Sequence, residues 1–281
     1  MIVSVLMTAF NREKFIAEAI ESVLTSSYKN FELIVIDDFS TDNTVSIAQK
    51  YAKLDNRLRV IKNEKNLGQF ANRNKAVSLA LGEYIITVDS DDMIFDYSIE
   101  YLLKSMIEYP EASFAMRCTT QEHNVCLLSE EAIRNHFFKS PYLMHGPGAT
   151  VIKKSFFDFI GGYPVEYGVP GDMYFNLNAT CNSNIILLSK EFMFYRRHEG
   201  QEINNSYDYL INNYRYLRDA LLNIPFKLSS KEILFLNNKN KRRFLVNIFK
   251  YFFKTFNITK TTYALKKTSF GLHDAFAGLF H

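Results

Sequence analysis

The chain has 281 residues, of which 47% are apolar and 15% aromatic, so it is long and hydrophobic enough for a large globular core and is not a disordered chain. The net charge of +3 is unevenly spread, because residues 222–281 hold 11 lysines and arginines against two acids, whereas residues 1–221 carry a net −6. An odd number of cysteines without paired spacing, no visible signal peptide and no apolar run long enough to cross a membrane predict a cytoplasmic protein, free or peripheral on the cytoplasmic membrane face.

The first hundred residues alternate between strand and helix patterns. Short apolar runs without polar alternation predict strands that are covered on both faces, and apolar stripes at helical spacing predict amphipathic helices. The expected strands are 2–7, 31–37, 58–63 and 82–89, and the expected helices are 13–25, 42–53, 68–81 and 96–108. This alternation predicts an α/β protein with a doubly wound, mainly parallel sheet and right-handed crossovers.

The rest of the chain is less regular up to residue 200 and helical after it. Residues 146–163 read as a loop, a strand and a short helix, residues 186–198 read as strand, and 111–147 contain no recognisable element. Beyond residue 205 the pattern is helical, with breaks near Pro225 and around 257–260. We therefore expect one domain over residues 1–204 and a basic, aromatic helical region over 205–281.

Polar clusters follow three of the predicted strands, at residues 7–12, 37–43 and 89–92. The carboxyl ends of parallel strands open onto one edge of a sheet, where ligands bind. Three acids at 89–92 repel one another unless a cation or free water screens them. A solvated turn with helix-capping acids is the alternative, but the coincidence of three clusters favours a site.

Clustered carboxylates suit a hard divalent cation such as Mg²⁺ or Mn²⁺, which would also hold a diphosphate leaving group. The phosphate-binding sequences of P-loop and dinucleotide-binding proteins are absent, and so is any His/Cys spacing typical of zinc. The acids therefore indicate a cation held together with a ligand's phosphates.

Seven stretches in order resemble a family 2 glycosyltransferase with a GT-A fold. They are "SVLMTAFNR", "VIDDFSTDNT", "NLGQFANRNKA", "GEYIITVDSDD", "VIKKSFFDFIGGYP", "PGDMYF" and "YRRH", and they span about residues 1–200. The resemblance implies transfer of a sugar from a nucleotide diphosphate sugar to an acceptor. It also implies a nucleotide-sugar-binding half at 1–110 and an acceptor half at 111–204, followed by the helical extension.

The same resemblance implies a nucleotide-binding role for five residues. Thr8 and Ala9 would lie close to the base, and Asp38 would accept a hydrogen bond from the base imide, which fits uracil and therefore a UDP-sugar. Arg73 would face the nucleotide or its phosphates, and Asp89 would hold the ribose or reach the metal through water. The structural alternatives are ordinary strand-end residues at Thr8 and Ala9, a helix N-cap at Asp37 or Asp38, and a solvated helix charge at Arg73.

The resemblance further assigns the diphosphate and its metal. Asp91 would ligate Mn²⁺ or Mg²⁺ directly, and Asp92 would be a second ligand or a cap for the next helix. Arg196 and His198, from "YRRH", would approach the diphosphate, although a lone histidine is more often a surface or packed residue.

Asp172 occupies the position of the family's catalytic base. Family members usually carry Glu-Asp there, whereas this chain has Gly171 before Asp172. A base must take the proton of the acceptor hydroxyl as it attacks the sugar from the face opposite the diphosphate, so one displacement inverts the anomeric centre. The alternative is an N-cap for a helix starting at Met173.

The chain lacks the Q-x-x-R-W element of processive synthases, so we expect one sugar to be transferred per encounter. Residues 239–267 interleave basic and aromatic side chains, and one helical side holds Phe244, Ile248, Tyr251, Phe252 and Phe256. This composition favours contact with an anionic membrane, which suits a lipid-linked acceptor. Packing on the catalytic core or self-association is the next interpretation, and nucleic-acid binding is the least favoured.

The leading interpretation is an inverting, metal-dependent glycosyltransferase that builds a surface glycan on a glycan or lipid-linked acceptor. Two others stay open. A nucleotidyltransferase also uses acids on an α/β sheet, but it would need a glycine-rich basic loop after the first strand, where this chain has "MTAFNREK". A nucleotide-sugar-binding scaffold that has lost catalysis would keep the same motifs.

Overall fold

The computed structural model describes residues 2–198 and 206–279. Its first part alternates strands and helices as the sequence predicts, and each helix begins one to three residues later than predicted. The elements are β1 (Val3–Ala9), α1 (Ile16–Leu24), β2 (Phe31–Asp37), α2 (Thr44–Ala52), β3 (Leu58–Lys62), α3 (Gln69–Ser78), β4 (Tyr84–Thr87), β5 (Met93–Ile94) and α4 (Ser98–Glu108).

The second part contains the segment that the sequence pattern left undecided. Its elements are β6 (Ala112–Arg117), β7 (Val125–Leu127), α5 (Ser129–Phe138), η1 (Pro147–Ala149), β8 (Thr150–Lys153), α6 (Lys154–Phe159), α7 (Gly171–Asn182), β9 (Asn184–Leu188) and β10 (Met193–Phe194). The prediction of strand throughout 186–198 is wrong, because polar residues 189–191 separate β9 from β10 and the two strands join different sheets.

Eight strands form the main sheet in the order β3-β2-β1-β4-β8-β6-β9-β7. The neighbours β3, β2, β1 and β4 are parallel, and so are β6 and β9. β8 runs antiparallel to both β4 and β6, and the edge strand β7 is antiparallel to β9. β5 and β10 form a separate two-stranded sheet. The predicted mainly parallel α/β sheet is therefore confirmed.

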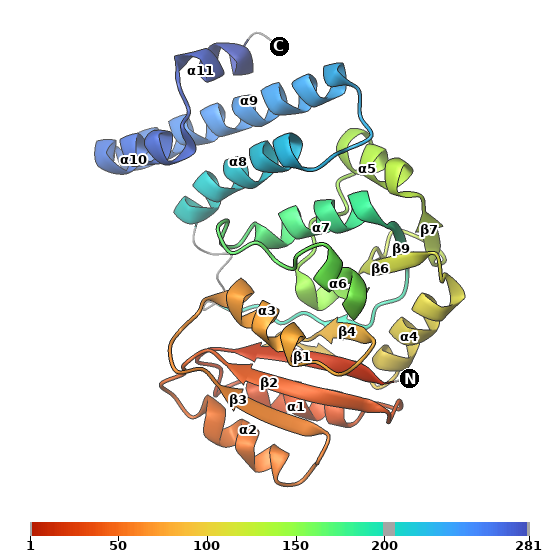
Figure 1. Ribbon diagram of the computed structural model, residues 1–281. Helices are drawn as coiled ribbons and strands as arrows, with labels where there is room; N and C mark the ends of the chain where they lie inside the picture. The colour runs from red at the N-terminus through yellow and green to blue at the C-terminus, as the bar shows by residue number, and fades with distance from the viewer. Residues whose placement is uncertain (1, 199–205, 280–281) are drawn as a thin grey trace.

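Helices cover both faces of the main sheet (Figure 1). Along β1, Val3, Val5 and Met7 join one hydrophobic core with α1, α2 and α4. Leu6 points the other way and joins a second core with α3, α5, α6 and α7. Side chains on a strand alternate between faces, so continuous apolar runs are what a doubly covered sheet requires.

The C-terminal helices are α8 (Ser206–Asn223), α9 (Ser230–Thr255), α10 (Ile258–Thr268) and α11 (Leu272–Leu279). The breaks between them confirm the predicted interruptions near 225 and 257–260. α8 packs on α7 and adds Tyr216, Ala220 and Leu221 to the second core. α9 lies across α8, and α10 and α11 lie along α9 (Figure 1). Within the described residues no helix is both long and apolar enough to cross a membrane.

The expectation that one side of α9 faces lipid is wrong for the first half of that side. Phe244 and Ile248 are buried at 2% and 4% exposure, in small cores shared with α8, α10 and the α10–α11 turn. Tyr251 and Phe252 are only partly buried, and Phe256 follows the last residue of α9. Helical spacing identifies such a stripe, but it does not say whether protein or lipid covers it.

Candidate active site

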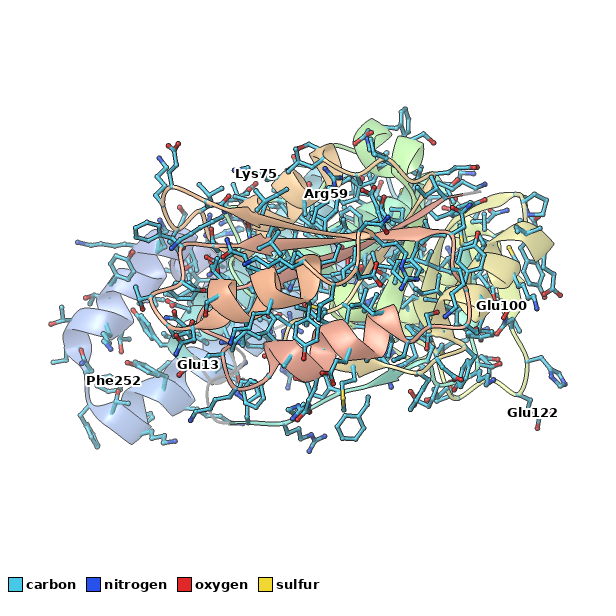
Figure 2. The ribbon with its side chains drawn as sticks, turned by 90° about the horizontal axis from the view of Figure 1, so that it is seen from below. Glu13, Arg59, Lys75, Glu100, Glu122 and Phe252 are labelled. Atoms are coloured by element: carbon cyan, nitrogen blue, oxygen red, sulfur yellow. The ribbon has the colours of Figure 1, made fainter. Side chains whose placement is uncertain are left out.

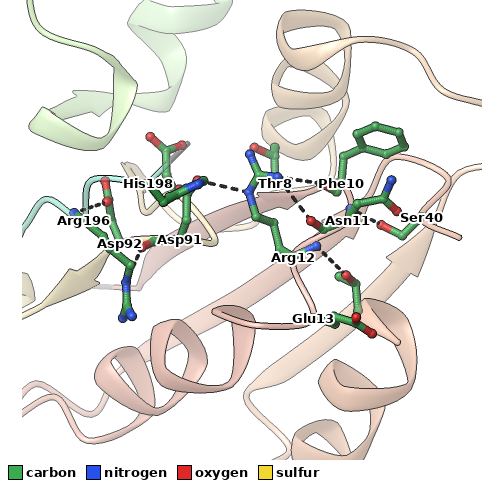
Figure 3. Close-up of polar contacts among 12 residues, drawn as sticks. Thr8, Phe10, Asn11, Arg12, Glu13, Ser40, Asp91, Asp92, Arg196 and His198 are labelled. Carbon is green, nitrogen blue, oxygen red and sulfur yellow. Dashed lines mark hydrogen bonds and ion pairs between the residues drawn. The ribbon is translucent and has the colours of Figure 1, made fainter. Parts of the chain in front are cut away.

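The three polar clusters at the strand ends meet at one edge of the sheet, as predicted. The backbone N–H of Asn11, after β1, donates to Ser40 Oγ at 2.8 Å, and Asn11 Oδ1 accepts from the Thr41 N–H at 3.0 Å. The Arg12 side chain then reaches the third cluster, since its Nε donates to Asp91 Oδ2 at 3.0 Å. Figure 3 shows Asn11 beside Ser40 and Arg12 between this loop and Asp91.

A cavity of about 760 Å³ lies at this edge. Eight of the ten residues predicted for the site line it, and only Arg196 and His198 do not. The eight are Thr8, Ala9, Asp38, Arg73, Asp89, Asp91, Asp92 and Asp172. The lining is completed, on the side of the second half of the chain, by residues 117, 144–149, 169, 173, 193, 195, 197 and 209. A cavity of this size is in the usual range for small-molecule sites.

Asp38 shapes the loop that leads into α3. Its Oδ1 accepts hydrogen bonds from the Leu67 N–H at 2.8 Å and Asn63 Nδ2 at 2.9 Å, and its Oδ2 accepts from the Gly68 N–H at 2.9 Å. Gly68 has a φ of +85°, a conformation that favours glycine. Glycine at this position therefore lets the loop turn so that the Gly68 N–H reaches the Asp38 carboxylate. Oδ2 accepts this one hydrogen bond from the chain, and a carboxylate oxygen has room for a second.

Arg73 is buried and holds two other predicted residues in place. Its Nη1 donates to Thr8 Oγ1 at 2.9 Å and its Nη2 to Asp89 Oδ1 at 2.7 Å. Burial alone would lower the pKa of Arg73, but the charge of Asp89 raises it, so the guanidinium stays charged. The interpretation of Arg73 as a solvated helix charge is therefore wrong.

Asp91 carries two contacts on the same oxygen. Besides Arg12 Nε, His198 Nε2 lies 2.9 Å from Asp91 Oδ2 (Figure 3). Arg12 also donates from Nη1 to the carbonyl oxygens of Phe10 at 3.0 Å and Asn11 at 3.2 Å, which fixes the guanidinium in the loop. Arg12 was not predicted as a site residue. The one sequence signal for it is its position at the end of the polar cluster 7–12 that follows the first strand.

Asp92 turns toward the segment after β10. Its Oδ1 accepts a hydrogen bond from the Arg196 N–H at 2.9 Å, and the N-cap position of α4 is Tyr97, so Asp92 does not cap the next helix. Burial, together with the charges of Asp89 and Asp91, raises the pKa of Asp92 to about 7, although the hydrogen bond from the Arg196 N–H opposes this rise. Asp92 thus ties the acidic turn to residues 195–198.

Arg196 points toward α1 rather than into the cavity. Its Nη2 pairs with Glu18, its guanidinium lies 5.2 Å from the centre of the Phe15 ring, and its Nε donates to the Asp91 carbonyl oxygen at 3.0 Å. The His198 ring packs on the same Phe15 ring, with 4.6 Å between the ring centres. The two residues of "YRRH" therefore hold this segment against α1 and the acidic turn.

Asp172 lies in the first turn of α7 and faces the cavity. Its Oδ1 accepts from the Met173 N–H at 2.7 Å. The helix begins at Gly171 with Pro170 at the N-cap position, so the alternative of a cap for a helix starting at Met173 is wrong. Burial raises the pKa of Asp172 to about 7, Arg73 opposes this rise, and Asp89 adds to it.

The absence of the usual acid before Asp172 has a packing cause. A Cβ atom on Gly171 would lie 2.5 Å from the Phe70 ring, which is far closer than any real contact. The ring of Phe70 therefore occupies the space that a side chain at 171 would need. On the other side of Asp172, a Cβ on Gly146 would lie 3.6 Å from its Oδ2, so the loop before β8 passes close to the carboxylate.

The donor set at the acidic turn fits a hard divalent cation only together with a ligand. Among the described residues, no three histidine, cysteine, aspartate or glutamate side chains form a metal site by themselves. Mg²⁺ commonly takes one or two protein carboxylates and completes its shell with phosphate oxygens and water. Asp91 at the cavity wall, with His198 beside it, matches such a partial set.

Comparison with known proteins adds independent information. The family model described as "Glycosyl transferase family 2" matches residues 4–151. Glycosyltransferase GlyG of Streptococcus pneumoniae is 29% identical over 233 residues, which cover 74% of each chain. Seven further glycosyltransferases match over 15–42% of their own length.

Two solved structures share the fold. S. aureus TarS 1–349 in complex with UDP-GlcNAc has a TM-score of 0.76 at 21% identity, and the match covers 95% of this chain and 80% of TarS 1–349. Mannosyltransferase PcManGT from Pyrobaculum calidifontis, in complex with GDP-Man and Mn²⁺, has a TM-score of 0.60 at 16% identity over 97% of this chain and 77% of that one.

Proposed function

Because this chain belongs to glycosyltransferase family 2 and has the GT-A fold, we propose that it transfers one sugar at a time from a UDP-sugar to a hydroxyl of a glycan or lipid-linked acceptor, with inversion. The observation that carries the proposal is the cavity, where the acids of the first half face Asp172 of the second half across one space. TarS, which has the same fold, binds UDP-GlcNAc, and this supports a UDP-sugar as the first donor to test.

The donor would lie against the strand ends of the first half. Thr8 and Ala9 would contact the base, and the free lone pair of Asp38 Oδ2 would accept from the uracil imide. Arg73 acts here mainly as a positioning residue, because its two short hydrogen bonds fix Thr8 and Asp89. Asp89, held in this way, would then contact the ribose.

Asp91 would hold Mn²⁺ or Mg²⁺ at the diphosphate, with His198 and Arg196 close by. The cation would stabilise the diphosphate as a leaving group when bound. Arg12 Nε and His198 Nε2 both contact Asp91 Oδ2, so the two side chains hold this carboxylate in place at the cavity wall. Asp92 Oδ1 accepts a hydrogen bond from the Arg196 N–H, so Asp92 would position the acidic turn. It would make at most a secondary contact with the cation.

Asp172 would act as the general base. A carboxylate with a pKa of about 7 is close to the optimum for accepting a proton near neutral pH. The acceptor hydroxyl would lie between Asp172 and the sugar carbon, give its proton to the carboxylate and attack from the face opposite the diphosphate. One carboxylate is enough for this single displacement, which inverts the anomeric centre.

The organisation of the chain follows from these roles. We propose that residues 1–110 bind the nucleotide sugar, that 111–204 bind the acceptor, and that 205–281 form the helical extension. We also propose a cytoplasmic location, which agrees with the three free thiols of Cys118, Cys126 and Cys181.

The direct test is a thermal-shift screen of nucleotides and UDP-sugars with and without Mn²⁺, followed by measurement of UDP release. UDP should stabilise the protein more strongly when Mn²⁺ is present. Asp91→Asn should remove this metal effect and nearly abolish transfer, since it takes a charged ligand from a hard cation and keeps its shape. Arg12→Gln removes a competing cation from Asp91, so it should keep the metal effect.

Two outcomes would contradict the proposal. A variant Asp91→Asn with full turnover in the presence of a chelator would exclude the metal role. A protein that binds UDP-sugars and releases no UDP, with or without acceptors, would be the non-catalytic binding protein. A nucleotidyltransferase would instead join a nucleoside triphosphate and a sugar phosphate to form a nucleotide diphosphate sugar, and it would release inorganic diphosphate, which a separate assay with those two substrates would detect.

A further inference from the structure

Large apolar side chains are exposed where α9 ends and α10 begins. We call this surface the α9–α10 tip and define it as residues 246–263. Phe253 is 64% exposed, Phe256 71% and Ile258 67%, and Phe249 and Tyr263 are also more than half exposed. Single exposed apolar residues are ordinary on a protein surface, but five within two adjoining helical segments are a patch that needs an explanation.

The phenylalanine rings of the tip form a continuous cluster. Phe249 and Phe253 stack with 6.4 Å between ring centres, and Phe252 lies 5.5 Å from Phe253 and 5.9 Å from Phe256. The chain therefore presents a group of adjoining rings at the end of one long helix.

Phe256 reaches this position through an unfavourable backbone conformation. It has a φ of +48° at the C-cap of α9, in the left-handed region where helices usually end with glycine. A bulky residue there is rare and costs conformational energy. The chain keeps a large, exposed ring at a position where glycine would be more stable. This indicates that the ring of Phe256 contacts a surface that is not part of this chain.

Positive charges surround the rings. Lys250, Lys254 and Lys260 are exposed, and the sequence contains no aspartate or glutamate from 246 to 273. The side of α9 that carries Phe244 and Ile248 is covered by protein, so the exposed rings in the second half of α9 are those of the tip. In Figure 2, Phe252 and Glu13, which follows β1 at the cavity edge, lie toward the same side of the molecule.

We propose that the α9–α10 tip docks on an anionic membrane surface, with its rings among the lipid headgroups and its lysines on the lipid phosphates. Exposed aromatic residues with lysines around them have the composition of an interfacial membrane anchor. A protein partner would also cover the rings, but a run of 28 residues without a single acid matches a uniformly negative surface better. The proposal is independent of the identity of the donor sugar.

The test is co-sedimentation of the full-length chain with vesicles at low and high salt. We expect binding to mixed phosphatidylglycerol and phosphatidylcholine vesicles, little binding to pure phosphatidylcholine, and release by salt because the attraction is screened. The triple variant Phe249→Ser, Phe253→Ser, Phe256→Ser should bind at least about tenfold more weakly. Phe159→Ser, which removes an equally exposed ring on α6, should bind like the natural chain.

A charge pair keeps the test valid if the triple variant does not fold. Lys250→Gln with Lys254→Gln alters only exposed side chains and should weaken binding about fivefold for each lysine. Lys53→Gln, at the exposed end of α2, is the matched control. The proposal is overturned if the natural chain does not bind anionic vesicles at low salt, or if the two control variants lose as much vesicle binding as the tip variants. It is also overturned if the triple variant dissociates a dimer and keeps its vesicle binding. UDP protection against unfolding reports the catalytic site separately in every variant.

Discussion

The two carboxylates with strongly raised pKa values have different surroundings and therefore different roles. Asp92 is enclosed by the segment after β10 and accepts a backbone hydrogen bond from Arg196. Asp172 faces the cavity and lies within the electrostatic influence of Arg73. Burial is the main cause of the raised pKa in both. Both line the cavity, but Asp172 lies in the half of the chain that we propose binds the acceptor, so it is the better placed of the two to take a proton from the acceptor hydroxyl.

The role of Asp172 predicts a pH dependence with a definite sign. A general base must be ionised, and the pKa of this carboxyl is raised from 3.8 to about 7, so the ionised fraction falls as the pH drops below about 7. The transfer rate at saturating donor should therefore rise with pH and level off above neutrality. Asp172→Asn should lower the rate by at least about a hundredfold and remove this rise.

Donor binding provides the control for that variant. Asp172 serves the acceptor side in our proposal, so the affinity for UDP should change little in Asp172→Asn. Equal losses of UDP binding and of turnover would instead assign the residue to the donor site or to the fold of α7.

At the scale of elements, the sequence predicts best where the pattern is repeated. The alternating apolar runs and helical stripes of the first hundred residues identified every strand there except the two-residue β5. The segment 111–147 was left undecided because β6 joins strands distant in sequence and β7 is a short edge strand. Such pairings depend on contacts across the sheet, and local patterns do not record them.

The candidate site was predicted as a set of residues but not as a network. Family resemblance placed Asp91 and His198 near the diphosphate, and they do lie together. It gave no role to Arg12, because an arginine after a strand end has many possible partners in the sequence. It also could not explain Gly171, whose reason lies in the ring of Phe70 on a different helix.

The contact between α7 and α3 predicts the effect of changing Gly171. Gly171→Ala places a Cβ within 2.5 Å of the Phe70 ring, so the ring or the helix must move. Overpacking of this kind destabilises a protein by roughly 1–3 kcal/mol, which denaturant unfolding would measure. The movement should also displace Asp172 and lower the transfer rate.

Gly271→Ala is the matched control, because a Cβ there meets nothing within 4 Å. Adding Phe70→Leu to Gly171→Ala should recover part of the lost stability by opening the space. If Gly171→Ala were as stable as the natural chain, the ring of Phe70 could not be the reason for a glycine at this position.

At the scale of the whole molecule, the C-terminal helices belong to the packing of the protein as well as to its surface. α8 contributes Tyr216 and Leu221 to the core that covers one face of the main sheet. α9 in turn covers α8, where Tyr214 packs against Phe244 with 4.7 Å between ring centres. The unequal charge of the two parts, which is evident in the sequence, does not reveal this continuity of contacts.

This layering predicts that a chain ending at residue 238 is less stable than the full-length protein. The truncation removes most of α9 together with α10 and α11, and it leaves Tyr214 and Ile211 of α8 without the side chains that bury them. Losing the cover of buried aromatic and aliphatic side chains costs several kcal/mol, since each contributes about 1.5–3 kcal/mol when fully buried. Thermal unfolding should show a lower Tm, and the exposed face of α8 should promote aggregation.

The triple ring variant of the α9–α10 tip is the control, because its side chains are exposed and its Tm should stay close to that of the natural chain. A truncated chain with an unchanged Tm and an unchanged denaturant slope would mean that α9 adds nothing to the stability of the catalytic part, and the α8–α9 contacts would then be a separate unit.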